Sequence, residues 1–191
     1  MAPVTRLLLC FGSWLIWLAP FFLFRPRNQP EPVQKKPAAR IGIILQSIGY
    51  FLAYTHTPAE WAEPIQPWRV AVGLILVIPA IVLAWQSIRI LGKQWRVDAG
   101  LNADHQLIKT GPYALIRHPI YASMFLMLLA GIAWFGTLPL WPVSLAFFIA
   151  GIEIRIRVED SLLRERFGQE FTRWADSTPA YLPFARSVMD L

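Results

Sequence analysis

At residues 111–121 the chain reads GPYALIRHPIY, and residues 122–135 continue it as the apolar run ASMFLMLLAGIAWF. A dense polar cluster, with Arg117 beside His118, therefore precedes a hydrophobic helix. Ionisable residues at the end of a membrane span either anchor the span at the interface or belong to a functional site. The stretch predicts a helix that starts at Pro119, because proline is tolerated in the first helical turn.

The composition of the chain indicates a membrane protein. Of 191 residues 55% are hydrophobic, nine are tryptophan, and mean hydropathy is +0.43, a balance that one soluble core could hardly bury. The net charge of +6 comes from basic residues between apolar runs, which favours loops beside anionic lipid over nucleic-acid binding. Cys10 is the one cysteine, which excludes an internal disulfide.

The apolar runs predict an all-α, polytopic fold with about five transmembrane helices, at residues 7–24, 41–54, 70–85, 119–136 and 138–154. Residues 41–54 are short for a span. The basic loops 25–40 and 89–117 lie on the same face of the membrane only if this segment crosses, and basic loops gather on the cytoplasmic face. We therefore expect an external N-terminus and a cytoplasmic C-terminus. A turn at residues 136–142 should join the last two spans.

The region after the fifth span predicts a helix that leaves the membrane and continues without a break as far as Pro179. Its apolar residues recur every three or four positions, at Leu163, Phe167, Phe171 and Trp174. Such a stripe is typical of an interfacial helix on lipid headgroups, and it would also suit a lid over a pocket. The sequence leaves both interpretations open.

Charged residues near the end of the fifth span are candidates for chemistry. Arg155 and Glu159 are one helical turn apart, and such pairs often only stabilise an exposed helix by ~0.2–0.5 kcal/mol. Ionisable residues beside an apolar span are costly, however, and this favours a functional role. No histidine pair has metal-ligand spacing, so no metal site is predicted, and neither a phosphate-binding glycine loop nor a nucleophile elbow is present.

Several motifs occur in one order: HQLIKTGPYALIRHPIYASMFLMLLAGIAW from residue 105, RVEDSLLRERFGQEFTRW from residue 157, and TPAYLPF from residue 178. In this order they resemble the isoprenylcysteine carboxyl methyltransferase family, integral membrane enzymes that use S-adenosylmethionine. The resemblance covers about residues 88–184. It implies one membrane domain over residues 1–191, with a cytoplasmic helical cofactor-binding half in residues 88–191. The apolar runs predict three spans in residues 1–87.

The resemblance also implies roles for individual residues. It places S-adenosyl-L-methionine against His105, Gln106, Leu107, Ile108, Tyr113, His118, Pro119, Ile120, Tyr121 and Glu159. Arg155 is similar to the arginine that the family directs at the substrate carboxylate. Asp160 stands where many relatives have glutamate, and Ser177 precedes Thr178 where relatives that methylate prenylated cysteines often have a basic residue, so both roles stay open.

The implied activity is methyl transfer to a lipid-like acceptor reached from the bilayer, with carboxyl O-methylation expected first. A sulfonium and a carboxylate lose their charges in that reaction, so positioning and exclusion of water matter more than acid-base groups. The acceptor stays open between a prenylcysteine, another lipid carboxylate and a lipid amine. Two further classes are an NADPH-dependent reductase similar to the sterol reductases and a non-enzymatic membrane subunit. No nucleic acid or obligate protein partner is indicated.

Overall fold

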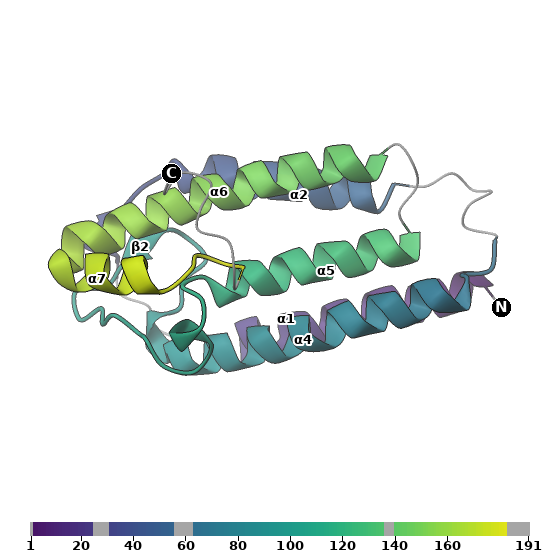
Figure 1. Ribbon diagram of the computed structural model, residues 1–191, viewed down its shortest axis with the longest axis horizontal. Helices are drawn as coiled ribbons and strands as arrows, with labels where there is room; N and C mark the ends of the chain where they lie inside the picture. The colour runs from purple at the N-terminus through teal and green to yellow at the C-terminus, as the bar shows by residue number, and fades with distance from the viewer. Residues whose placement is uncertain (1, 25–30, 56–62, 136–139, 183–191) are drawn as a thin grey trace.

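The computed structural model describes residues 2–24, 31–55, 63–135 and 140–182. Five long helices run side by side and form an elongated bundle (Figure 1). They are α1 (Ala2–Leu23), α2 (Ala39–Ala53), α4 (Pro67–Leu91), α5 (Pro119–Phe135) and α6 (Leu140–Phe167). Each predicted span therefore coincides with a helix. The turn expected at residues 136–142 lies mostly outside the described residues.

Small elements gather at the end of the bundle where α4 ends and α5 begins (Figure 1). They are the 3-10 helices η1 (Gly92–Gln94) and η2 (Gly111–Ala114), the helix α7 (Gln169–Ser177), and the strands β1 (Gln34–Lys35) and β2 (Gly100–Leu101). The strands pair in antiparallel fashion, Gln34 with Leu101 and Lys35 with Gly100. The sequence did not predict this pairing, which ties the loop before α2 to the loop after α4.

Two helix pairs hold the bundle together: α2 packs along α6, and α4 packs along α5. At the α2–α6 crossing, a Cβ atom added to Gly42 would lie 2.6 Å from the carbonyl oxygen of Gly151. Ser144 Oγ donates to the carbonyl oxygen of Gly49 at 2.8 Å, about two turns farther along the same contact. Small residues allow the two backbones to approach closely, as is common between helices in membranes.

Two of the helices are long and apolar enough to cross a membrane, over Val4–Leu23 and Pro67–Gln94. α2 and α5 are apolar but shorter, with 15 and 17 residues, and α6 carries charges in its second half. The helical fold agrees with the sequence prediction, whereas crossing by all five helices remains a prediction.

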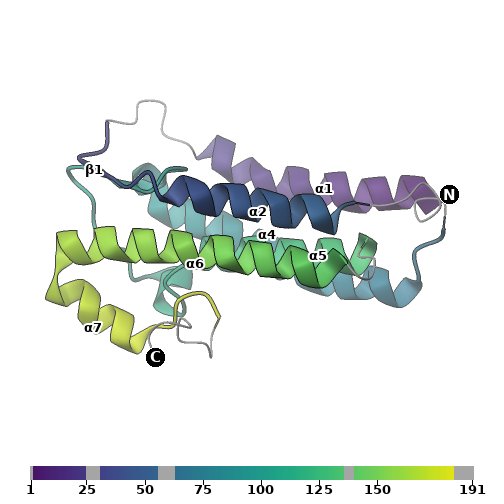
Figure 2. The same cartoon turned by 90° about the horizontal axis from the view of Figure 1, so that it is seen from above.

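The expectation of one unbroken helix up to Pro179 is wrong. α6 ends at Phe167, Gly168 adopts φ of +53°, and α7 then turns back beside the end of α6 (Figure 2). The Gly168 N–H still donates to the carbonyl oxygen of Arg164 at 2.9 Å. Glycine reaches positive φ without a steric penalty and commonly ends helices in this way, so it overrides the good helix formers around it.

Candidate functional site

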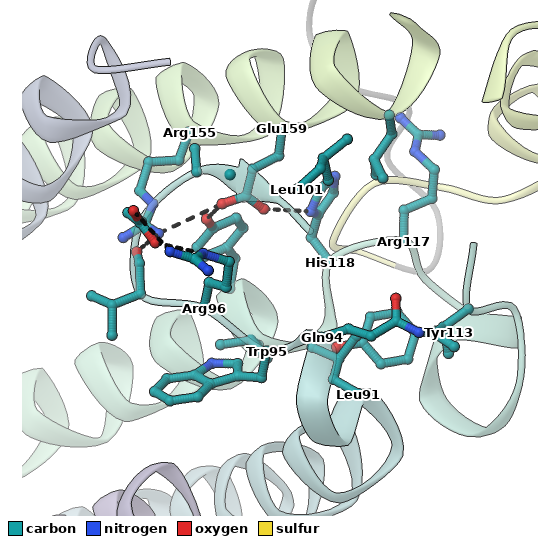
Figure 3. A pocket seen from close by; sticks show the side chains of 18 of the residues that line it. Leu91, Gln94, Trp95, Arg96, Leu101, Tyr113, Arg117, His118, Arg155 and Glu159 are labelled. Atoms are coloured by element: carbon teal, nitrogen blue, oxygen red, sulfur yellow. Dashed lines mark hydrogen bonds and ion pairs between the residues drawn. The ribbon is translucent and has the colours of Figure 1, made fainter. Parts of the chain in front are cut away.

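A cavity of about 400 Å³ lies at the end of the bundle that carries the small elements (Figure 3). Its walls come from the last turns of α1, the segment after α4, η2, the start of α5 and the second half of α6. All the residues that the sequence assigned to the site line it, except Pro119. Pro119 is buried as the first residue of α5.

Glu159 lies at the centre of a group of charged and polar side chains that face the cavity. It accepts a hydrogen bond from the Tyr121 hydroxyl, and its carboxylate is 3.6 Å from His118 Nδ1 and 3.5 Å from Arg155 Nη2. We call these residues, His118, Tyr121, Arg155 and Glu159, the cavity cluster. His118 directly precedes α5 and Tyr121 lies in its first turn, whereas Arg155 and Glu159 lie on α6. The position of α5 relative to α6 therefore sets the geometry of the cluster.

Arg155 is held in place on several sides. Its Nη2 donates to the carbonyl oxygen of Val97 at 3.0 Å, and its guanidinium lies 5.1 Å from the centre of the Tyr121 ring, a cation–π distance. Its Cγ would be 2.5 Å from a Cβ atom at Gly42, so the glycine leaves room for the side chain. Arg155 Nε is buried and has no hydrogen-bond partner among the described residues.

A second pair of charges, Arg117 and Asp160, adjoins the cavity cluster, and Arg117 also lines the cavity. We call this pair the rear cluster. Arg117 Nη2 is 3.1 Å from Asp160 Oδ2, and Nη1 donates to the carbonyl oxygens of Ala175 and Thr178. Neighbouring backbone bonds run from the N–H of Arg117 to Pro179 and from the N–H of His118 to Ala180. The rear cluster therefore fastens α7 and the segment after it to the start of α5.

His118 joins the two clusters. Its Nε2 is 2.8 Å from Asp160 Oδ1, while its Nδ1 faces Glu159. Burial alone would lower the pKa of His118, but the carboxylates of Asp160 and Glu159 outweigh burial and raise it to about 9. His118 is therefore protonated near neutral pH, and both of its N–H groups point at carboxylates.

His105 and Gln106 form another wall of the cavity. The Gln106 N–H donates to Gln94 Oε1 at 2.8 Å, which fixes the backbone of this segment. His105 Nδ1 is buried and has no hydrogen-bond partner among the described residues. Burial lowers the pKa of His105, so a neutral imidazole lines the cavity with an unused polar atom.

The apolar stripe that the sequence predicts is turned toward the site. Phe171 and Trp174 on α7 are buried and pack with Tyr113 of η2, and the Trp174 side chain also lines the cavity. Leu163, from the end of α6, lines the same cavity. Of the two interpretations of this stripe, the packing supports a lid.

Two parts of the cavity were missed by the sequence analysis. Trp17 and Phe21 on α1 form an apolar wall, and Phe21 packs edge-on against Trp95 with ring centres 5.6 Å apart. Arg96 also lines the cavity and pairs with Asp98 at 3.0 Å. No signal in the sequence connects the first helix with this region, although WRVD at residues 95–98 is a visible polar interruption after an apolar helix.

Comparisons with known proteins link the chain to membrane methyltransferases. A family model described as phospholipid methyltransferase matches residues 68–170, which include the start of α5 and Glu159. The protein-S-isoprenylcysteine O-methyltransferase of Saccharomyces cerevisiae is 36% identical over 91 residues, covering 44% of this chain and 35% of the yeast protein.

Another relative is a cobalt-zinc-cadmium resistance protein of Cupriavidus metallidurans, which is 28% identical over 150 residues, covering 75% of this chain and 63% of that protein. The chain thus spans less than two thirds of either relative. A solved structure of a eukaryotic intramembrane Ras methyltransferase, an isoprenylcysteine carboxyl methyltransferase, has a TM-score of 0.63 and 21% identity. That match covers 95% of this chain and 68% of the solved one, and it shows a common fold.

Proposed function

The chain belongs to the phospholipid methyltransferase family, and from this premise we propose that it is a membrane methyltransferase that uses S-adenosylmethionine. One observation carries the proposal: all the residues that the motifs assigned to the cofactor, except Pro119, line one cavity, although they are up to 54 positions apart, from His105 to Glu159. A chance set of interface anchors would not converge in this way.

The residues of the cavity fit the chemical groups of S-adenosylmethionine. Glu159 would face the cationic end of the cofactor. The positive charge of His118, whose Nδ1 is 3.6 Å from Glu159 and therefore not hydrogen-bonded to it, would attract the cofactor carboxylate. The unused His105 Nδ1 offers a hydrogen bond to a polar group, and apolar walls suit an adenine. When bound, the cofactor supplies an electrophilic methyl group, which passes to the acceptor and leaves S-adenosylhomocysteine.

The charges around the cavity favour a carboxylate acceptor. The cavity cluster and the rear cluster together contain three cationic side chains, Arg117, His118 and Arg155, against two carboxylates, Glu159 and Asp160. A net positive site attracts a carboxylate and disfavours an ammonium group. Arg155 would orient the carboxylate, because a guanidinium presents a planar pair of donors to two oxygens.

The acceptor would reach the cavity from the bilayer. Trp17, Phe21 and Phe22 on α1 line the cavity with apolar surface, and Phe22 is also 70% exposed, so this wall reaches the outside of the bundle. Such a wall suits the hydrocarbon chain of a prenylated or fatty acceptor, while its polar end meets the cavity cluster. The α7 lid would exclude water from the methyl donor.

The same proposal includes a membrane orientation: five spans, the N-terminus outside and the cavity at the cytoplasmic face. Single cysteines introduced at Glu63 and Lys93, in a protein with Cys10 replaced by alanine, test it. Both positions are exposed in the structure. Reagents that do not cross membranes should label Glu63→Cys from outside and Lys93→Cys only from the cytoplasmic side. Labelling of both from one side would contradict five spans.

The activity itself is tested with purified protein, S-adenosylmethionine carrying a radioactive methyl group, and a panel of lipid-linked acceptors. The panel contains S-prenylcysteine carboxylates, fatty acids and phosphatidylethanolamine. We expect label to enter a carboxylate as a base-labile ester. Transfer to the amine alone would preserve the enzyme class and contradict the carboxylate acceptor. Absence of transfer to every member, although the cofactor binds, would contradict the acceptor class.

A further inference from the structure

A second cavity, of about 340 Å³, shares part of its wall with the first one. Residues 95–99 line both cavities, and the remaining wall of the second comes from residues 36–43 at the start of α2. The two walls are tied together, because the N–H of Lys36 donates to the carbonyl oxygen of Ala99 at 3.2 Å and the N–H of Val33 to Leu101 at 2.9 Å. The β1–β2 pair therefore holds the two walls of this cavity in place.

Three cationic side chains line the second cavity. Lys36 pairs with Glu165 and also donates to Ser161 Oγ, and Arg96 pairs with Asp98. Arg40 differs from them, because it makes no ion pair with any residue that the structure describes. Two of the cations are thus compensated, and one positive charge at the rim is left for a ligand. A phosphodiester carries one negative charge, and a guanidinium can bind two of its oxygens.

The position of the second cavity points to lipid. Ile43 and Pro37 add apolar surface to its wall. Ile41 and Ile44, which flank this turn of α2, are 56% and 59% exposed, so their side of the helix would face acyl chains. A cationic rim above an apolar helix face matches the two parts of a phospholipid at an interface.

We propose that the second cavity binds the phosphodiester group of a phospholipid through Arg40. The proposal goes beyond methyl transfer and does not depend on it: the lipid would occupy a site separate from the methyl donor, against the shared wall of residues 95–99. Arg155 donates to the carbonyl oxygen of Val97 in that segment, so an occupied second cavity would brace the wall against which Arg155 rests.

Native mass spectrometry of the detergent-solubilised protein tests the proposal by counting bound lipids during titration. The probes are phosphatidylglycerol, dioleoylglycerol, which lacks the phosphate, and inorganic phosphate. We expect one tight phosphatidylglycerol site and weaker binding of dioleoylglycerol. Arg40→Gln should lower the affinity for phosphatidylglycerol about tenfold, as expected for loss of a charge-assisted contact. Arg40→Lys should fall between wild type and Arg40→Gln.

Arg89→Gln is the matched control, because Arg89 is an exposed arginine on α4 at the same end of the bundle and lines neither cavity. It should leave the tight site unchanged. Equal losses in Arg40→Gln and Arg89→Gln would show general attraction to basic loops and overturn the proposal. Equal binding of dioleoylglycerol would also overturn it. Inorganic phosphate that binds as tightly as the lipid, in an Arg40-dependent way, would identify a soluble phosphate site instead.

Discussion

The cavity cluster and the rear cluster contain residues that are neighbours in the sequence, yet the two clusters have different roles. His118 follows Arg117, and Asp160 follows Glu159. Glu159 lines the cavity and binds three side chains around it, whereas Asp160 lies behind and binds Arg117. One residue along an α-helix is a rotation of about 100°, which is enough to point one carboxylate into the cavity and the next away from it.

The comparison indicates that the cavity cluster recognises ligands, whereas the rear cluster stabilises the fold. The cavity cluster holds charges where a ligand can reach them, and its loss should change binding or turnover. The rear cluster uses its charges on the backbone of the segment after α7, and its loss should change stability. His118 contacts residues of both clusters, so it should respond in both ways.

The largest effect is expected from breaking the rear cluster. Arg117→Gln leaves Asp160 without its arginine and the Ala175 and Thr178 carbonyl oxygens without a donor. Removing one member of a buried ion pair costs about 3–5 kcal/mol. A denaturant titration of the protein in detergent should show this loss in the free energy of unfolding. Arg173→Gln, on the exposed side of α7, is the control and should cost under about 0.5 kcal/mol. Equal stability of the two variants would contradict the stabilising role of the rear cluster.

The next effect separates the two ligands of the cavity. Arg155→Lys keeps the charge but not the planar pair of donors, so we expect methyl transfer to a carboxylate to fall by about a hundredfold. Affinity for S-adenosylmethionine should stay nearly normal. Arg157→Lys, exposed on the same helix, should change neither quantity. Unchanged turnover in Arg155→Lys would remove Arg155 from the mechanism.

Glu159 and Asp160 give the sharpest test of the comparison because they are adjacent acids. Glu159→Gln removes a charged contact to the cofactor and should weaken binding of S-adenosylmethionine by about ten- to a hundredfold, equivalent to about 1.5–3 kcal/mol. Compared with Glu159→Gln, Asp160→Asn should lower the melting temperature more and the affinity for S-adenosylmethionine less. Isothermal calorimetry and thermal unfolding on the same preparations measure both. The opposite pattern would reverse the roles of the two clusters.

The smallest effect is a pH dependence that comes from His118. Its pKa is raised from 6.5 to about 9 in the folded protein, so its stabilising contribution is complete below pH 6.5 and is lost as pH rises through 9. The melting temperature should therefore fall between about pH 7 and 10 more steeply in wild type than in His118→Asn. His105→Asn should leave the slope unchanged, because the pKa of His105 is lowered. Equal slopes in wild type and His118→Asn would contradict the charged histidine.

Much of this arrangement was predictable from the sequence because the signals are local. Apolar runs located the five long helices, and the motif around residues 111–121 located the site. The family membership predicted from these motifs is confirmed by the match to the family model and by the relatives. The roles of the assigned residues stay predictions, although nearly all of them meet in one cavity.

The rest depends on contacts between distant segments, which periodicity does not encode. The wall contributed by Trp17, the β1–β2 pairing and the second cavity all join residues more than fifty positions apart. The break at Gly168 is different, because a glycine after Phe167 was a readable stop signal. Helix propensity was given too much weight there.

Titration of the purified protein with S-adenosylmethionine and, separately, with NADPH tests the central claim most directly. Calorimetry should show one saturable site for S-adenosylmethionine, competed by S-adenosylhomocysteine, and no saturable binding of NADPH at comparable concentrations. The phosphates of NADPH call for several converging basic side chains, and the Glu159 carboxylate inside the cavity would repel them. Saturable NADPH binding without S-adenosylmethionine binding would contradict the methyltransferase and favour a reductase.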